Sequence, residues 1–260
     1  MDRREAVLRE LNLYPLWVRK NQHDPVVEEQ AGAAVGQPVP GLSPAARAEP
    51  VEISEPAAVS PVHALTDPAG TGPAVPLPDW TGLKQQVRGC TACKLRAGCT
   101  QTVFGVGDEQ ADWLFVGEGP GADEDALGEP FVGQAGKLLD NMLAAIRLKR
   151  GKDVYIGNIV KCRPPGNRAP EADEIAACLP YLQRQIELIR PKIIVALGKV
   201  ASNALLGKDA TLASLRGTRH DYRGIPLVIT YHPAYLLRSP SEKAKAWQDL
   251  RMAVSVMAGQ

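Results

Sequence analysis

The sequence lacks an apolar run long enough to cross a bilayer, and its N-terminal stretch MDRREAVLRELN is charged from the second residue. A membrane span needs about 20 consecutive apolar residues, and a secretory signal needs an apolar core behind a short basic start. We therefore expect a soluble, cytoplasmic protein with no membrane partner. In a reducing compartment the five cysteines are not expected to form a disulfide framework, which favours a metal or cluster site.

Residues 23–79 contain no aromatic residue and no lysine, but they hold half of the 22 prolines and carry a net charge of −7. Such a segment cannot bury enough apolar surface to offset the entropy lost on ordering. We predict a disordered acidic linker here. It would join residues 1–22, a short amphipathic element and candidate site for a protein partner, to a catalytic domain at residues 80–260. That domain has a net charge of +6, which permits a polyanion as partner.

From Trp80 onward, short apolar runs alternate with longer segments of helical periodicity. The runs predict strands at residues 113–117, 154–160, 192–198 and 226–233, and the longer segments predict helices at residues 133–149, 169–191, 199–207 and 240–259. Continuously apolar strands separated by helices indicate an α/β fold, with a central, mostly parallel sheet covered by helices on both faces. Ligands of such sheets bind beyond the carboxyl ends of the strands. We expect three strand ends to converge on one crevice.

Four of the cysteines are spaced as metal ligands. Cys90 and Cys93 form a C-x-x-C pair, Cys162 follows the second predicted strand, and Cys178 lies in the next predicted helix. Four thiolates from such segments suit a [4Fe-4S] cluster or a structural zinc ion, and the spacing leaves both metals open. Cys99 has no place in this set. The simpler alternative is that Cys178 is an ordinary buried residue of a helix.

Six motifs occur in order along residues 83–258: the C-x-x-C pair, GEGPGADED, GEPFVGQAGKLLDNML, NIVKCRPPGNR, a cysteine sixteen residues after the last one, and TYHPAYLLR. Together they resemble family-four uracil-DNA glycosylases, the iron-sulfur branch of the uracil-DNA glycosylase superfamily. The resemblance implies a monomeric, monofunctional DNA repair hydrolase with a [4Fe-4S] cluster rather than zinc. Such an enzyme flips uracil out of single- or double-stranded DNA and cleaves its N-glycosidic bond, which leaves an abasic site for base excision repair.

The resemblance also implies the residues that hold the flipped base. Phe131 matches the aromatic residue that stacks on uracil, and Asn158 matches the amide that reads its Watson-Crick edge, as a flipped base requires. Glu124 matches an acidic residue that lines the pocket near uracil C5. Gly119 lies where the backbone approaches the base closely, an approach that a side chain would block.

The catalytic residues implied by the resemblance are Glu118, Asn167 and His232. His232 matches the donor to uracil O2, where negative charge develops as the base leaves. Glu118 and Asn167 match positions that place the attacking water. Carboxylates crowded into GEGPGADED suit this reaction because glycosidic cleavage leaves a cationic, oxocarbenium-like sugar. Gly119 stands where the best-studied family of the superfamily has its water-activating aspartate, so the resemblance leaves the identity of the general base open.

DNA contacts are implied by the motif YLLR, which matches the loop that wedges into the duplex and comprises Tyr235, Leu236, Leu237 and Arg238. Further candidate phosphate donors, chosen for their place beside motifs, are Arg163, Arg168 and Arg219. No lysine in the strand-end motifs matches a Schiff-base nucleophile, although Lys161 is close in sequence, so we expect no lyase step. Phosphate contacts predict binding that weakens steeply with salt.

Simpler structural roles remain open for single residues. Phe131 suits a core aromatic, His232 a cap, Glu124 and Asp125 the positive end of the following helix, and YLLR ordinary packing. Other functions also remain open. One is a covalent uracil-trapping relative, although the KRRIH-like stretch of that group is absent and SLRGTRHDYRG, with His220, does not match it. The others are a non-catalytic iron-sulfur DNA-binding or redox module, and a docking adaptor built on residues 1–79.

Overall fold

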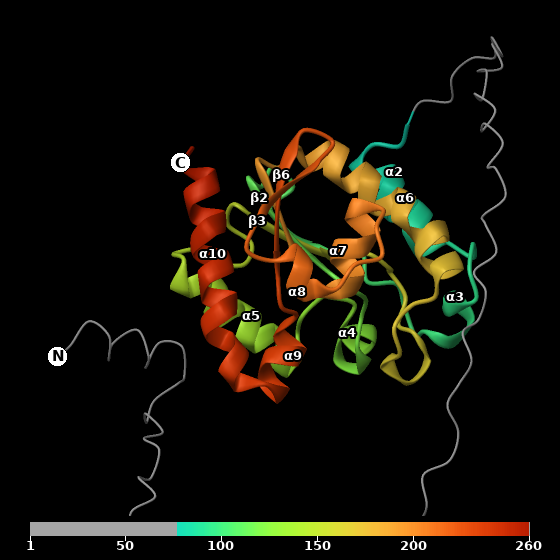
Figure 1. Ribbon diagram of the computed structural model, residues 1–260. Coiled ribbons are helices and arrows are strands. Elements are labelled where there is room, and N and C mark those ends of the chain that lie inside the picture. The colour runs from blue at the N-terminus through green and yellow to red at the C-terminus, as the bar shows by residue number, and fades with distance from the viewer. Residues whose placement is uncertain (1–76, 260) are drawn as a thin grey trace, which may run out of the picture. The chain divides into compact units, whose positions relative to one another are not determined.

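The computed structural model describes residues 77–259 (Figure 1). The predicted N-terminal element at residues 1–22 lies outside the described residues, as does the predicted linker up to residue 76. The described chain enters its first helix, α2, at Trp80, where the catalytic domain is predicted to begin. Between residues 77 and 259, no helix is long and apolar enough to cross a membrane.

A six-stranded sheet in the order β1-β3-β2-β4-β6-β5 forms the centre of the domain. The strands are β1 Val106–Gly107, β2 Trp113–Gly117, β3 Val154–Asn158, β4 Ile193–Leu197, β5 Arg219–Tyr222 and β6 Ile225–Thr230. The pairs that join β3, β2, β4 and β6 are parallel, and the two edge strands β1 and β5 pair antiparallel to their neighbours. The mostly parallel sheet is confirmed.

The four predicted strands are confirmed as β2, β3, β4 and β6. Every residue of β2, β3 and β4 is buried, because these strands lie inside the sheet and helices cover both faces. The edge strands carry no comparable apolar pattern, since β1 has two residues and β5 reads RHDY. Short or polar edge strands lack the repeated apolar positions from which a strand is predicted, so these two strands were not predicted.

Helices cover both faces of the sheet. They are α2 Trp80–Arg88, α3 Leu95–Gly98, α4 Ala122–Leu127, α5 Gln134–Ala145, α6 Ala172–Ile189, α7 Lys199–Leu206, α8 Leu212–Leu215, α9 Pro233–Arg238 and α10 Lys243–Met257, with short 3-10 turns at Pro165–Asn167 and Pro240–Glu242. In Figure 1, α5 and α10 lie on one side of the strands, and α2, α6 and α7 on the other. Each side has its own buried cluster, with Leu139 and Leu250 on the first and Leu182 and Ile186 on the second. The three-layer α/β fold is confirmed.

The chain order places a crevice at the end of β2. From β2 the chain passes to β3 on one side of it, and later to β4 on the other. In parallel sheets, the point where the strand order reverses leaves an opening at the carboxyl ends of the strands. The motifs GEGPGADED, NIVKCRPPGNR and TYHPAYLLR follow β2, β3 and β6, so the topology brings all three to this edge.

Candidate active site

A cavity of about 510 Å³ opens at this edge of the sheet. Segments that follow β2, β3, β4 and β6 line it, together with the start of α5. All seven residues expected to bind uracil or catalyse its release are among the lining residues: Glu118, Gly119, Glu124, Phe131, Asn158, Asn167 and His232. A volume of this size suits a single nucleotide base with part of its sugar and phosphate. The structure therefore brings together residues that lie up to 114 positions apart in the sequence.

Phe131 and Asn158 meet at Gly117, the last residue of β2. A Cβ atom at Gly117 would lie only 2.6 Å from the Phe131 ring and would also collide with the side-chain oxygen of Asn158. Glycine is therefore required for the ring and the amide to converge. Asn158 is only 2% exposed, and its Oδ1 is buried without a hydrogen-bond partner among the described residues. Such a group is costly unless a ligand satisfies it.

Phe131 is held in a backbone conformation that bulky residues seldom adopt. Its φ is 56°, in the left-handed region. The Phe131 carbonyl accepts a hydrogen bond from Arg150 Nη2 at 2.8 Å, and Gly136 passes so close that a Cβ there would overlap this carbonyl. Backbone strain of this kind persists where surrounding contacts enforce it, and it is common at ligand sites.

His232 presents one particular tautomer to the cavity. It caps the N-terminus of α9, where its Nδ1 accepts a hydrogen bond from the Ala234 N–H at 3.2 Å. Burial, with a smaller contribution from nearby Arg238, lowers the pKa of His232 to about 4, although Glu124 opposes the change. The imidazole is therefore neutral at pH 7. Because Nδ1 is an acceptor, Nε2 carries the proton and is available as a donor.

Glu118 and Asn167 lie on the remaining wall of the cavity. Burial raises the pKa of Glu118 above its usual value, which suits a group that accepts a proton. Asn167 has a φ of 56° and follows Gly166, whose φ is 63°. The Asn167 Oδ1 accepts a hydrogen bond from Arg163 Nε at 2.7 Å. This bond orients the amide and leaves its NH₂ group for another partner.

Two other acids of GEGPGADED, Glu124 and Asp125, have structural partners. Glu124 accepts hydrogen bonds from three backbone N–H groups, those of Gly121, Val132 and Gly133, at 2.9 to 3.1 Å. Asp125 is buried and accepts from the Thr100 N–H at 2.9 Å. Both carboxylates also lie in the first turn of α4, where the helix dipole favours negative charge. The simpler structural role thus applies to Asp125, while Glu124 holds two loops of the cavity wall together.

One wall of the cavity was not anticipated from the sequence. Lys199, the first residue of α7, lines the cavity after Gly198, whose φ is 90°. A Cβ at Gly198 would lie 3.0 Å from the Cβ of His232, so a small residue is needed there. The sequence did contain a signal for this wall, because the predicted strand at residues 192–198 also ends at this edge of the sheet. The expected crevice included only three strand ends and left this fourth one out. Lys199 also pairs with exposed Asp209 at 3.2 Å.

The sequence matches a family with this arrangement. A sequence model described as the uracil DNA glycosylase superfamily matches residues 104–251. The chain belongs to this superfamily. It is 46% identical over 177 residues to the type-4 uracil-DNA glycosylase of Thermotoga maritima, a match that covers 66% of this chain and 92% of that protein. The type-4 uracil-DNA glycosylases of Archaeoglobus fulgidus and Pyrobaculum aerophilum are 42% and 41% identical, with 64% and 67% of this chain and 87% and 92% of theirs covered.

The candidate DNA-binding arginines of this superfamily member differ in their partners. Arg168 and Arg238 line the cavity. Arg168 donates to both oxygens of buried Glu174 at 2.8 and 2.7 Å, and this pairing lowers the pKa of Glu174 to about 2. Arg163 donates to Asn167, as described above. Arg219 lies on the edge strand β5, and it is not among the residues of the cavity wall.

The wedge motif YLLR forms most of α9, and its side chains point in different directions. Tyr235 and Leu237 are 39% and 44% exposed, whereas Leu236 is 1% exposed and packs in the core. The expectation that Leu236 faces DNA is therefore corrected, because its side chain is buried beside side chains of α5 and α10. Tyr235 lines the cavity and stacks on Tyr231, with ring centroids 5.2 Å apart.

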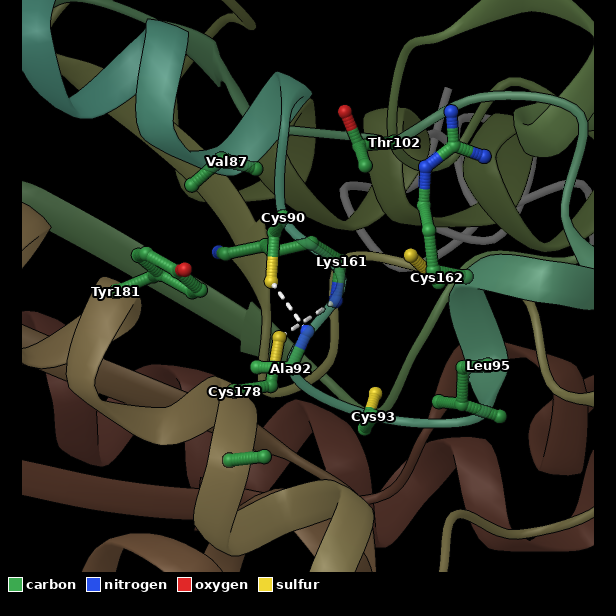
Figure 2. Close-up of a pocket in the computed structure, with 12 residues that line it drawn as sticks. Val87, Cys90, Ala92, Cys93, Leu95, Thr102, Lys161, Cys162, Cys178 and Tyr181 are labelled. Carbon is green, nitrogen blue, oxygen red and sulfur yellow. Dashed lines mark hydrogen bonds between the residues drawn. The ribbon is translucent and has the colours of Figure 1, made fainter.

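The four predicted metal ligands line a second, smaller cavity (Figure 2). Cys90 and Cys93 come from the loop between α2 and α3, Cys162 from the segment after β3, and Cys178 from α6. Two of the thiols accept backbone hydrogen bonds, Cys90 from Ala92 at 3.4 Å and Cys178 from Lys161 at 3.2 Å. These N–H groups would stabilise thiolate ligands.

Two kinds of metal site place different demands on four thiolates. Zinc requires its four ligands to converge on one ion, whereas in a [4Fe-4S] cluster each thiolate binds a different iron atom. Within residues 77–259, no three side chains of His, Cys, Asp or Glu converge closely enough to hold one ion. Four thiols spread around one cavity fit a cluster better. Cys99 is buried beside Cys162 but is not among the residues that line this cavity.

Proposed function

We propose that this chain is a type-4 uracil-DNA glycosylase, which hydrolyses the N-glycosidic bond of uracil in DNA and leaves an abasic site. The observation that carries the proposal is the convergence of Phe131, Asn158 and His232 on one cavity. This set offers an aromatic face, an amide and a neutral N–H donor, which are the groups needed to hold a flipped pyrimidine. The type-4 relatives support the same function.

In the proposed mechanism, the flipped uracil stacks on Phe131 and pairs its edge with the buried Asn158 amide. The bond between C1′ of the sugar and N1 of the base breaks, and its electron pair leaves with uracil. The Nε2–H of His232 donates to uracil O2, where that negative charge gathers. A donor aimed at developing charge lowers the barrier because the interaction strengthens in the transition state.

The sugar side of the reaction uses Glu118 and Asn167. The Glu118 carboxylate stabilises the cationic sugar and accepts a proton from water as the water oxygen bonds to C1′. The free NH₂ of Asn167, oriented by Arg163, holds that water. The departed uracil anion then takes up a proton, so the reaction consumes one water and yields uracil and an abasic site.

A monofunctional reaction also fits the position of Lys161. This lysine is 1% exposed, and its Nζ donates to the Asn158 carbonyl at 2.9 Å and to Gln185 Oε1 at 2.6 Å. Among the residues that line the active-site cavity there is one lysine, Lys199, and it pairs with Asp209. Neither ammonium is prepared for attack on C1′, because a Schiff base requires a free, neutral amine.

We further propose that Cys90, Cys93, Cys162 and Cys178 hold a [4Fe-4S] cluster with a structural role. When bound, it would cross-link the loop before β1 to α6 and to the segment after β3. Duplex or single-stranded DNA would lie across Arg238, Tyr235 and Leu237 at the rim of the cavity, with Arg163, Arg168 and Arg219 as further candidate phosphate contacts. The predictions of a monomer and of a cytoplasmic protein remain untested.

A matched pair of DNA strands tests the proposed function. Purified protein is incubated with a uracil-containing oligonucleotide and with a thymine control, and the products are heated in alkali. We expect strand scission at uracil alone, and only after the alkaline step. An uncut uracil strand would contradict glycosylase activity, scission without alkali would contradict the monofunctional mechanism, and a persistent protein-DNA adduct would favour the covalent uracil-trapping alternative.

A further inference from the structure

Lys161 lines the thiol cavity and contacts Asn158 of the active-site cavity, and it has no role in the chemistry proposed above. Its backbone N–H donates to Cys178 Sγ, and its Nζ reaches the opposite way to the carbonyl of Asn158. Figure 2 shows Lys161 among the residues that line the thiol cavity, with its backbone hydrogen bond to Cys178 drawn. One residue thus contacts a thiol of the proposed cluster and the residue proposed to read uracil.

A buried ammonium is costly unless its surroundings satisfy it. Lys161 is satisfied by two oxygens, the carbonyl of Asn158 at 2.9 Å and Gln185 Oε1 at 2.6 Å. Gln185 is itself fixed, because its Nε2 donates to the Phe104 carbonyl at 3.0 Å and to Tyr155 Oη at 3.2 Å. The ammonium is therefore held in place from α6, the helix that carries Cys178.

The side chain of Asn158 depends on its backbone for its direction. Its Oδ1 has no partner among the described residues, so no side-chain hydrogen bond through that oxygen orients the amide. Asn158 is the last residue of β3, and beyond it the chain is held by the N–H groups of Ile159 and Val160, which donate to Gly117 and Glu118. The Asn158 carbonyl points to the other side and is held by the Lys161 ammonium.

From this geometry we propose that Lys161 is a positioning residue that fixes Asn158 for uracil and ties it to the thiol-bearing helix α6. The inference rests on the proposed glycosylase function. Loss of the ammonium leaves the Asn158 carbonyl and Gln185 Oε1 without a partner, which frees the end of β3 to shift. A displacement of about 1 Å at a substrate-positioning group can cost about 100-fold in rate.

The test compares two variants in the same buried network. Lys161→Met removes the ammonium and nearly keeps the length of the side chain. Tyr155→Phe removes the hydroxyl that accepts a hydrogen bond from Gln185 Nε2 and leaves the bond between Lys161 and Asn158 in place. Each full-length protein is assayed for single-turnover uracil excision. Each is also assayed for binding to uracil-free DNA and to DNA with an uncleavable 2′-fluorinated deoxyuridine. Visible absorbance and the melting temperature report on the thiol centre and the fold.

We expect K161M to excise uracil about 100-fold more slowly and to lose its preference for the uncleavable uracil site, while its affinity for uracil-free DNA stays unchanged. Y155F is expected to melt at a lower temperature and to keep its preference for uracil. Excision by K161M at the wild-type rate would overturn the inference, as would equal losses in both variants. If K161M does not fold, Lys161→Gln, which keeps an N–H donor without the charge, replaces it under the same criteria. A wild-type protein that releases no uracil would overturn the proposed function as well.

Discussion

Substitution of His232 is the most direct way to separate catalysis from structure at this site. The imidazole has two tasks on its two nitrogens, since Nδ1 caps α9 through the Ala234 N–H and Nε2–H is proposed to donate to uracil O2. His232→Ala removes both groups. His232→Asn keeps a good N-cap acceptor but is too short to place a donor where Nε2–H lies. The two variants therefore differ in helix capping and share the loss of the catalytic donor.

The expected magnitudes follow from these two tasks. Removal of one preorganised donor to developing negative charge costs about 100- to 1000-fold in rate, or about 2.7–4 kcal/mol. Loss of an N-cap costs about 1 kcal/mol of folding free energy. We therefore expect both variants to excise uracil about 100- to 1000-fold more slowly under single-turnover conditions. Only H232A should also show the lower stability to urea.

The pH dependence of the wild-type protein provides a second test of His232. Because burial lowers its pKa to about 4 from 6.5, the ring stays neutral through the range in which an ordinary histidine titrates. The Nε2–H donor is then present at both pH 8 and pH 5. A wild-type excision rate that falls on acidification with an apparent pKa near 6.5, together with no such fall in H232N, would refute the neutral-donor reasoning. An H232N rate within about tenfold of the wild-type rate would also refute it.

Three further predictions concern other parts of the molecule. Burial raises the pKa of Glu118, and its carboxylate is proposed to be the active form. The excision rate should therefore fall as the pH drops through this raised pKa. Glu118→Gln should abolish this fall at acidic pH in a pH-rate profile. Cys178→Ser should reduce the visible absorbance per protein and lower the melting temperature, whereas a preparation of wild type that is colourless and contains zinc would contradict the cluster. Leu236→Ala should destabilise the fold by about 2–5 kcal/mol in urea titrations because the side chain is buried. Leu237→Ala should leave stability nearly unchanged and weaken excision from duplex DNA more than from single strands; the reverse pattern would show that Leu236 is the wedge.

The sheet was predictable from the sequence wherever burial alone determines the pattern. The strands β2, β3 and β4 lie in the interior of the sheet and are buried at every position, so continuous apolar runs identified them. The edge strand β5 was missed because RHDY is four residues long and only Tyr222 in it is buried. Periodicity cannot separate so short a polar strand from a turn.

The composition of the site was predictable, but the partners of its charged residues were not. Motif order placed Phe131, Asn158 and His232 at one sheet edge, where they lie. Sequence could not show that Glu124 is committed to backbone N–H groups, or that Arg168 is paired with buried Glu174. Those pairings depend on loop geometry in three dimensions. The sequence likewise showed only that Lys161 lies close to a motif. The structure shows that its side chain is buried and that its Nζ donates to the Asn158 carbonyl.

The position of α2 has a consequence for the lifetime of the protein under oxidising stress. The chain enters the described structure at Leu77, and α2 ends two residues before Cys90. Trp80 secures this helix by edge contacts with Phe104 and Tyr155, and the proposed cluster holds its far end. If an oxidant destroyed the proposed cluster, α2 would keep this aromatic anchor and its buried side chains Leu83 and Val87, but its far end would lose its cluster link to α6. The loop that carries Cys90 and Cys93 would then be the segment that loses most support, and we expect proteases to cut the damaged protein there first.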